Sequence, residues 1–405
     1  MAAQAHPIRL AITDNLRRSR LTTFFRILLA IPHLIWVLLY SIGAFFAALA
    51  NWFATLATGR SPKGLHEFLA GYVRYVVYLS AYLHMAANPY PPFTALADEH
   101  YPIDVEIDPP ATQHRLITLF RVVLILPAWV LAYELGAGIW KMGNETFSVA
   151  GLVGILCWFV AVVLGRVPRG LRDLLAWAIG YSAQTWAYFL LLTDRYPSSD
   201  PLLHLATVTP PDAPGRARLV NSDDLQRSRL SVFFRLLLAI PHIVWLYLWT
   251  IAALLAAIAN WFVTLFAGRP AGALARFLSA YVRYQAHVYA FLFGIANPFP
   301  GFVGAAASYP VDVAIPAPER QHRLLTLFRV FLALPALMLS GILGYVLFVV
   351  GAYAWWVSLV RGRLTLGLQR AGAFVIGYQA QVSSYLFMLT DRYPYSSPLA
   401  VLEQE

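Results

Sequence analysis

Eight arginines at matched positions are the residues of this sequence whose type and spacing most clearly suggest chemistry. They occur in four copies of the pattern Arg-Leu-x3-Phe-Arg-x5-Pro, and they are Arg20, Arg26, Arg115, Arg121, Arg229, Arg235, Arg323 and Arg329. A guanidinium beside an apolar segment is costly unless it reaches the membrane surface or pairs with a partner. The simpler interpretation of these arginines is structural anchoring at the membrane interface. The more specific interpretation is that they bind a lipid phosphate or another anionic group. We therefore predict lipid or anion contacts at these eight positions.

A second set of polar residues lies within stretches that are otherwise apolar. Arg74 and Arg283 occupy matched positions, and Glu67 lies seven residues before Arg74, on the same face of a helix. An arginine inside a membrane span is a candidate functional residue, although a salt bridge or carbonyl contact that locks helices explains it equally well. Gln184 and Gln381 lie in the other copies, where side-chain amides commonly bond across helices. These five residues form a predicted intramembrane polar site.

Two histidines, His33 and His242, directly follow the repeated proline. Ligation of haem or a metal by this pair would require two copies to face each other with neutral imidazoles converging. Hydrogen bonding at the membrane interface is the other interpretation, and it is preferred. We therefore expect no metal and no cofactor, with these two histidines as the only candidates for ligands.

Enzymatic activity has little support in the motifs of the sequence. There is no HExxH pair, no Gly-x-Ser-x-Gly elbow, no phosphate-binding glycine loop and no dinucleotide-binding fingerprint. The net charge of +10 is accompanied by no pattern typical of nucleic-acid binding, but it fits contact with anionic lipid headgroups. We predict a protein that is not an enzyme and binds no nucleic acid.

The composition predicts a multi-pass protein of the cell membrane. Hydrophobic residues make up 59% of the chain and charged residues 12%, and the mean hydropathy is +0.61. Residues 32–58 and 241–267 contain no Asp, Glu, Lys or Arg, and each stretch exceeds the roughly 20 residues that cross a bilayer. Trp52, Trp158 and Trp261 lie near the ends of such stretches and are expected to anchor them at the headgroup layer.

The chain consists of four related units in the order A-B-A-B. Residues 20–89 match residues 229–298, and residues 114–197 match residues 322–394. Such self-similarity has to be recognised before a fold is predicted. The predicted units are A1 (1–93), B1 (94–201), A2 (202–302) and B2 (303–405).

Each unit is expected to contain a short strand, an interfacial helix, a span, a loop and a second span. In A1 the interfacial helix is predicted over residues 20–31 and the first span from Pro32. The predicted fold is therefore an all-α polytopic membrane protein with about eight transmembrane helices in four parallel two-span repeats. Its strands would form one small extramembrane β element, from residues 8–13, 103–107, 218–221 and 311–315. The direction of insertion stays open, because the positive charges divide almost evenly between the two faces.

B1 carries 11 residues more than A1 between the repeated proline and Gly165, including Lys141, Gly143, Asn144 and Glu145. This insertion is expected to break the first helix of B1. If it marks the tip of a hairpin, the first apolar segment would re-enter the membrane in every copy.

The A units resemble a bacterial membrane family known as domain of unknown function 4389. The resemblance rests on Arg-Leu-x3-Phe-Arg-x5-Pro-His, on the Trp-Phe pair before Gly-Arg-Ser-Pro at 59–62, and on Asn-Pro-Tyr-Pro-Pro-Phe at 88–93. The B units lack the histidine and end in Asp-Arg-Tyr-Pro. The resemblance implies the bacterial inner membrane and the unit boundaries, and it implies no catalytic activity.

Two functional hypotheses follow from the sequence. The first is a non-enzymatic scaffold, accessory subunit or lipid-interacting protein, whose partners are the bilayer and another membrane protein. The alternative is a transporter or channel with a polar site around Arg74 and Arg283. Gly180 and Gly377 replace these arginines in the B units, so such a site would have twofold rather than fourfold character.

Overall fold

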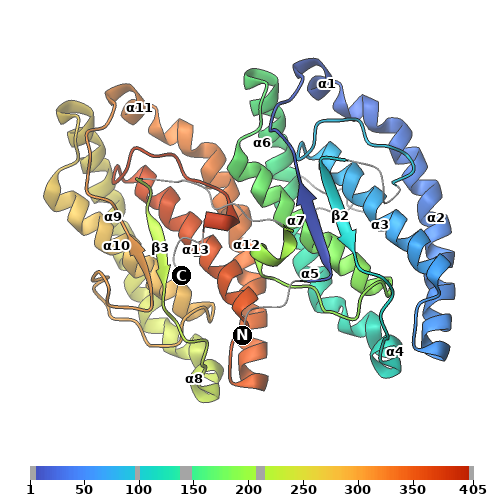
Figure 1. Cartoon of the computed structure of the whole chain (residues 1–405). Helices are drawn as coiled ribbons and strands as arrows, with labels where there is room; N and C mark the ends of the chain where they lie inside the picture. Colours follow the sequence, from blue (N-terminus) through green and yellow to red (C-terminus); the bar gives the residue numbers. More distant parts are fainter. Residues whose placement is uncertain (1–5, 96–100, 137–147, 207–214, 401–405) are drawn as a thin grey trace. The chain divides into compact units, whose positions relative to one another are not determined.

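The computed structural model describes residues 6–95, 101–136, 148–206 and 215–400. The chain forms two compact units: unit 1 is 1–209 with 397–399, and unit 2 is 210–396 with 400–405. Each unit therefore contains one A repeat and one B repeat (Figure 1). We describe the two units one at a time.

Unit 1 contains the A1 and B1 repeats. The elements of A1 are β1 (Ile8–Ile12), α1 (Arg20–Phe24), α2 (Arg26–Thr58) and α3 (Lys63–Leu83). The elements of B1 are β2 (Ile103–Ile107), α4 (Arg115–Leu124), α5 (Leu126–Leu135), α6 (Val149–Leu164), α7 (Arg169–Phe189) and the 3-10 helix η3 (Pro201–His204).

Unit 2 contains the A2 and B2 repeats. The elements of A2 are β3 (Arg218–Asn221), α8 (Arg229–Phe233), α9 (Arg235–Ala267) and α10 (Gly272–Leu292). The elements of B2 are β4 (Val311–Ala314), α11 (Arg323–Leu327), α12 (Arg329–Arg361) and α13 (Leu366–Leu386).

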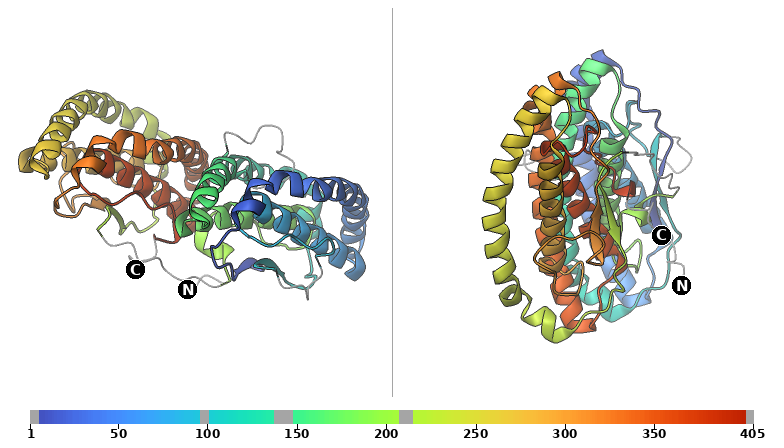
Figure 2. Two further views of the ribbon diagram at one scale, coloured as in Figure 1. Left: turned by 90° about the horizontal axis from the view of Figure 1, so that it is seen from above. Right: turned by 90° about the vertical axis from the view of Figure 1, so that its left-hand side faces the viewer.

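Each unit is built in three layers (Figure 2). In unit 1 the inner helices α3 and α7 pack side by side, with α2 against α3 and α6 against α7. The strands lie on the inner helices, β2 on α3 and β1 on α7, away from the outer helices. In unit 2, α10 and α13 are the inner helices, and α9 and α12 the outer ones. The inner helices therefore separate a layer of apolar helices from a layer of strands and connecting segments.

The outer helix α2 contacts α3 through small and polar residues at helical spacing. Its buried residues are Arg26, Ala30, His33, Val37, Ser41, Ala44, Asn51 and Thr55. The helix ends at Gly59, whose φ of 78° lies in the left-handed region that favours glycine. Gly165, Gly268 and Gly362 end the matching helices of the other repeats in the same way.

The A and B repeats of a unit run in opposite directions. α1, at the start of α2, packs on α6, whereas α4 packs on α2. The segment between α3 and α4 returns along α3, because Tyr78 contacts Asp104 while His66, nearer the start of α3, contacts the carbonyl of Asp108. The chain therefore begins B1 at the far end of α2. This differs from the parallel arrangement of repeats that the sequence predicted.

The strands form two separate sheets and not one. β1 pairs with β2 and β3 pairs with β4, both antiparallel. Each pair joins the strands of one A repeat and the following B repeat, so each unit has its own sheet. The expected single β element is therefore corrected.

The first helix also differs from the prediction at Pro32. Helix α2 continues through Pro32, and the break lies at Phe25, directly before the buried Arg26. A proline removes one helical hydrogen bond but need not end a helix that tertiary contacts hold. In B1 the break lies at Ile125, between α4 and α5, which are bent by 43°.

The predicted break of the first helix in B1 is confirmed, since α5 ends at Leu135 and α6 begins at Val149. Most of the inserted segment, 137–147, including Lys141, Gly143, Asn144 and Glu145, lies outside the described residues. In A1, A2 and B2 the corresponding helices are continuous over 33 residues. A re-entrant first segment in every copy is therefore wrong for these three repeats.

Among the described residues, α2, α9 and α12 are long and apolar enough to cross a membrane, and α4 with α5 would add a fourth candidate. The inner helices do not meet these criteria. The expectation of eight spans is not confirmed, whereas three such helices are consistent with a membrane protein.

Candidate membrane interface

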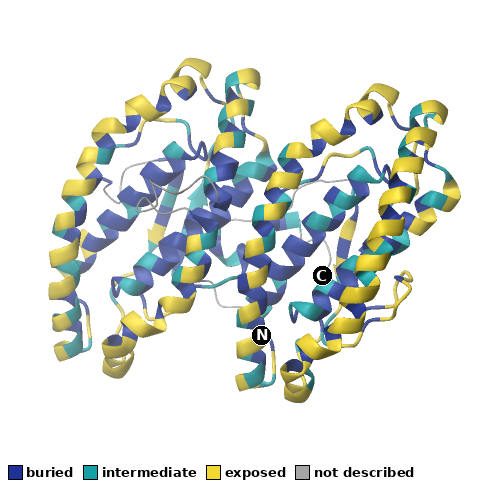
Figure 3. Cartoon of the chain, turned by 180° about the vertical axis from the view of Figure 1, so that it is seen from behind, coloured by how far each residue is buried: buried dark blue, intermediate teal, exposed yellow. Residues whose placement is uncertain are grey.

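The outer helices expose large apolar side chains over their whole length. On α2 these include Leu28, Ile42, Phe45 and Phe53, each more than half exposed. The same faces of α9 and α12 carry similar residues, and Figure 3 shows exposed residues recurring along the full length of the outer helices. Soluble monomers rarely expose apolar patches beyond a few hundred Å². This surface is therefore the main candidate site of the protein.

The long outer helices α2, α9 and α12 carry charged residues only at their ends. No Asp, Glu, Lys or Arg lies between Arg26 and Arg60, and the same holds between Arg235 and Arg269 and between Arg329 and Arg361. The small residues of α2 face inwards and the large ones outwards, which reverses the pattern expected in water. The surface is thus suited to lipid hydrocarbon.

Four of the eight repeated arginines are exposed at the start of the short first helices, and we call them the rim arginines: Arg20, Arg115, Arg229 and Arg323. The Nη2 group of Arg115 donates a 2.9 Å hydrogen bond to the carbonyl of Ala57, at the end of α2. In unit 2, Arg229 of the A repeat makes the reciprocal contact, a 3.0 Å bond to the carbonyl of Val360 near the end of α12. Because these guanidinium groups remain exposed, they can also reach an anionic group in the solvent or in a headgroup layer.

The other four repeated arginines lie inside the fold. Arg26, Arg121, Arg235 and Arg329 are at most 2% exposed. The Nη1 group of Arg26 donates hydrogen bonds of 2.7 Å to the carbonyl of Tyr82 and 2.8 Å to that of Ala87, just beyond α3. The other three make the same pair of bonds at the ends of α7, α10 and α13.

These buried arginines donate hydrogen bonds to carbonyl groups at and just beyond a helix end, where their positive charge is favourable. The guanidinium of Arg26 also stacks over the ring of Tyr82, 4.3 Å from its centroid. The four residues thus anchor helix ends inside the protein, where no headgroup reaches them, and this corrects their prediction as lipid contacts.

The residues of the predicted polar site are not brought together. Arg74 contacts Asp104 of β2 at 3.1 Å, and Arg283 donates a 3.1 Å hydrogen bond to the carbonyl of Val313 in β4. Each arginine thus fastens an inner helix to a strand of its own unit. Glu67 is exposed and pairs loosely with Lys63 at 3.8 Å, not with Arg74.

The two glutamines bond to a strand and to connecting segments rather than to neighbouring helices. Gln184 donates to the carbonyl of Ile8 at 2.9 Å and accepts a 2.9 Å bond from the N–H of Ser198. Gln381 accepts a 2.8 Å bond from the N–H of Tyr395. These contacts differ from the predicted hydrogen bonds between neighbouring helices.

The glycines that replace Arg74 and Arg283 have a packing explanation. A Cβ at Gly180 would lie 2.8 Å from the Cβ of His204, and one at Gly377 would lie 3.3 Å from that of Leu219. In the B repeats another segment therefore occupies the space that the arginine takes in the A repeats.

The histidines after the repeated proline are enclosed by aromatic side chains. His33 Nδ1 and the hydroxyl of Tyr75 share a 2.7 Å hydrogen bond, and the ring of Phe93 stacks on His33. His242 makes the same contacts with Tyr284 and Phe302. Each pair lies within one A repeat. Across the described parts of the chain, no group of three His, Cys, Asp or Glu side chains could hold a metal ion.

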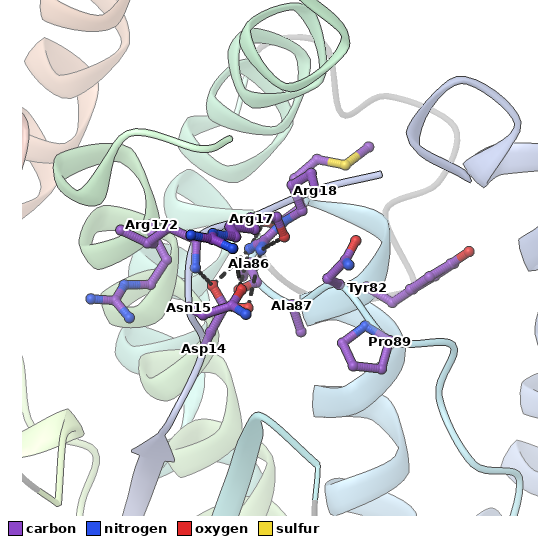
Figure 4. A network of polar contacts seen from close by, with 12 residues as sticks. Asp14, Asn15, Arg17, Arg18, Tyr82, Ala86, Ala87, Pro89 and Arg172 are labelled. Carbon is purple, nitrogen blue, oxygen red and sulfur yellow. Dashed lines mark hydrogen bonds and ion pairs between the residues drawn. The ribbon is translucent and has the colours of Figure 1, made fainter. Parts of the chain in front are cut away.

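A buried ion pair that the sequence reading missed fixes the end of α3. Asp14 and Arg18 pair at 2.9 Å, with both side chains at most 2% exposed (Figure 4). Arg18 also donates to the carbonyls of Met85 and Ala86 at 2.8 and 3.0 Å. Unit 2 repeats this arrangement with Asp223, Arg227, Gly294 and Ile295. The repeated Asp-x3-Arg spacing was the available signal.

An apolar hollow lies where α3 meets α7. Its lining includes Tyr72, Val76, Ile179 and Trp186. Tyr72 shares a hydrogen bond with Ser41 of α2, so this part of the hollow lies on the side of the outer helices.

A family model described as Domain of unknown function (DUF4389) matches the chain four times, over residues 20–95, 115–199, 229–303 and 323–397. The chain belongs to this family, in four tandem copies. Each match begins at a rim arginine and covers the helices of one repeat. No curated protein and no solved structure matches the chain.

Proposed function

We propose that this protein is a non-enzymatic scaffold that binds lipid through its outer helices and presents its strand layer to the aqueous side. The observation that carries the proposal is the exposed apolar surface of α2, α9 and α12, which bears no charge between the arginines at its ends. Acyl chains would contact this surface, and the rim arginines would contact anionic headgroups.

The positions repeated in all four copies support a structural role. The buried arginines hold helix ends, and the glycines end the outer helices. A scaffold needs such a rigid frame, and the strand layer would offer a surface to another membrane protein. The bacterial plasma membrane is the proposed location, as the family resemblance implies.

The transporter or channel alternative has less support. Arg74 and Arg283 would have to line a polar path, yet each is engaged with a strand of its own unit. The multi-pass arrangement with eight spans also stays a prediction. The lipid-binding proposal does not depend on it, because it requires only that the outer apolar faces contact hydrocarbon.

Flotation of the full-length protein with vesicles tests the proposal. We expect the protein to float with phosphatidylcholine vesicles and to bind more strongly when phosphatidylglycerol is added. Replacing all four rim arginines with glutamine should remove the preference for phosphatidylglycerol and leave flotation in place. A protein that stays monodisperse in buffer without detergent and does not float would overturn the proposal.

A further inference from the structure

We propose that the outer helices lie flat in one leaflet of the bilayer, so that the protein enters the membrane from one side without crossing it. This inference rests on the proposed function and specifies how the same surface meets lipid. It differs from the eight-span prediction, and three independent features of the structure carry it.

The first feature is the length of the exposed apolar surface. α2 and α9 each contain 33 residues, which corresponds to about 50 Å, against a hydrocarbon core of about 30 Å. Exposed apolar side chains reach from Leu21 to Phe53 in A1 and from Leu230 to Phe266 in A2. An upright helix would leave many of these side chains in water, whereas a helix in the membrane plane covers all of them.

The second feature is the strand layer. β1 and β2 run beside the inner helices and carry the Arg9–Glu106 ion pair, 2.9 Å long, with side chains 30% and 46% exposed. If the long helices crossed the bilayer, this two-stranded sheet would lie at membrane depth. Its charged side chains would then face lipid, which is energetically costly. With the helices lying flat, the inner helices separate the sheet from the hydrocarbon.

The third feature is the opposite direction of the two repeats within a unit. α2 and α6 run antiparallel but lie on the same face of the inner helices. When the helices lie flat, A1 and B1 present the same face to lipid, and Arg20 and Arg115 both lie at its border. When the helices stand upright, these two arginines belong to opposite membrane surfaces. Within a unit, only the flat arrangement lets both repeats use their rim arginines on the same leaflet.

Single cysteines test the arrangement in the full-length protein. Cys157 is the only native cysteine, so Cys157→Ala gives a background free of thiols. Ser19→Cys and Lys63→Cys place one thiol near each end of α2, and Glu106→Cys places one on the strand layer. In sealed vesicles from the expressing cells, an impermeant maleimide should label all three from the same side, and from the opposite side only after lysis.

A depth profile along α2 completes the test. Spin labels at Leu28→Cys, Ile42→Cys and Phe53→Cys should show equal depth, because all three exposed positions lie on a helix parallel to the surface. Two results together would show that the helix spans the bilayer: labelling of Ser19→Cys and Lys63→Cys from opposite sides, and a label at position 42 far deeper than the other two. They would overturn the flat arrangement and leave the proposed lipid binding intact. Labels that sense no lipid at all would overturn both.

Discussion

The indole N–H of Trp52 donates a 3.0 Å hydrogen bond to the carbonyl of Thr118, which ties the end of α2 to α4 of the other repeat. Trp158 makes the reciprocal 3.0 Å bond to the carbonyl of Thr23. Unit 2 repeats both contacts, from Trp261 to Thr326 and from Trp355 to Val232. The A and B repeats of each unit are thus joined to each other at both ends. The structural unit of this chain is therefore a pair of repeats and not a single repeat.

Loss of the indole N–H should weaken this connection. In Trp52→Phe the ring is retained and one hydrogen bond is lost, which should lower the free energy of unfolding by about 1 kcal/mol. Thermal unfolding in detergent measures the change. The adjacent Phe53→Leu is the control, because Phe53 is 58% exposed on the outer face. Equal unfolding temperatures for Trp52→Phe and the unmodified protein would show that the bond contributes nothing.

The buried and the rim arginines should respond differently to substitution. Arg26→Met removes the two arginine bonds to the carbonyls of Tyr82 and Ala87, and the Tyr82 carbonyl keeps only the N–H of Met85. The loss of these buried charged bonds should cost about 3 kcal/mol. Arg20→Gln changes an exposed residue and should alter the free energy of unfolding by less than about 0.5 kcal/mol. Chemical unfolding of both variants in the same detergent checks the contrast. A similar loss in both would contradict the separation of the two sets.

The glycine of B1 that replaces the A-repeat arginine is expected to be essential for packing. Gly180→Ala places a Cβ 2.8 Å from that of His204, and the required shift should cost about 1 to 3 kcal/mol. Gly64→Ala is the matched control, since nothing lies within 4 Å of its added Cβ and alanine favours the helix. We expect a lower unfolding temperature for the first variant and an unchanged or higher one for the second. The reverse order would be incompatible with the packing described.

Unit 1 should lose stability as the solution becomes acidic. Burial, with a smaller effect of the nearby His6, lowers the pKa of His204 to about 3, and burial lowers the pKa of His6 to about 4. Both values lie below that of an unfolded histidine, near 6.5. The unfolded chain therefore binds protons first, so the stability that is complete above pH 6.5 decreases as the pH falls towards 4.

Unfolding temperatures at pH 7.5 and pH 5 measure this dependence. His204→Gln removes one of these two histidines and should show a smaller difference between the two pH values than the unmodified protein. An unchanged difference would assign the acid sensitivity to other residues.

The repeats and the apolar helices could be predicted from the sequence because both are local patterns. The direction of B1 relative to A1 could not. The direction of B1 depends on the segment after α3, which returns along that helix through contacts such as Arg74 with Asp104. A local sequence pattern does not reveal which residue a side chain will contact. The arginines show the same limit. Arg20 and Arg26 have similar neighbours in sequence, but only Arg26 meets backbone carbonyls at the end of another helix.

The most direct test of lipid binding by the outer surface measures the accessibility of a spin label at Phe45→Cys in vesicles. A spin label at Glu106→Cys, on the strand layer, serves as the comparison. We predict that the label at position 45 is accessible to oxygen and protected from a water-soluble nickel complex, and that the label at position 106 shows the opposite. Exposure of position 45 to the nickel complex, or its protection from both reagents by a protein partner, would contradict the proposed membrane interface.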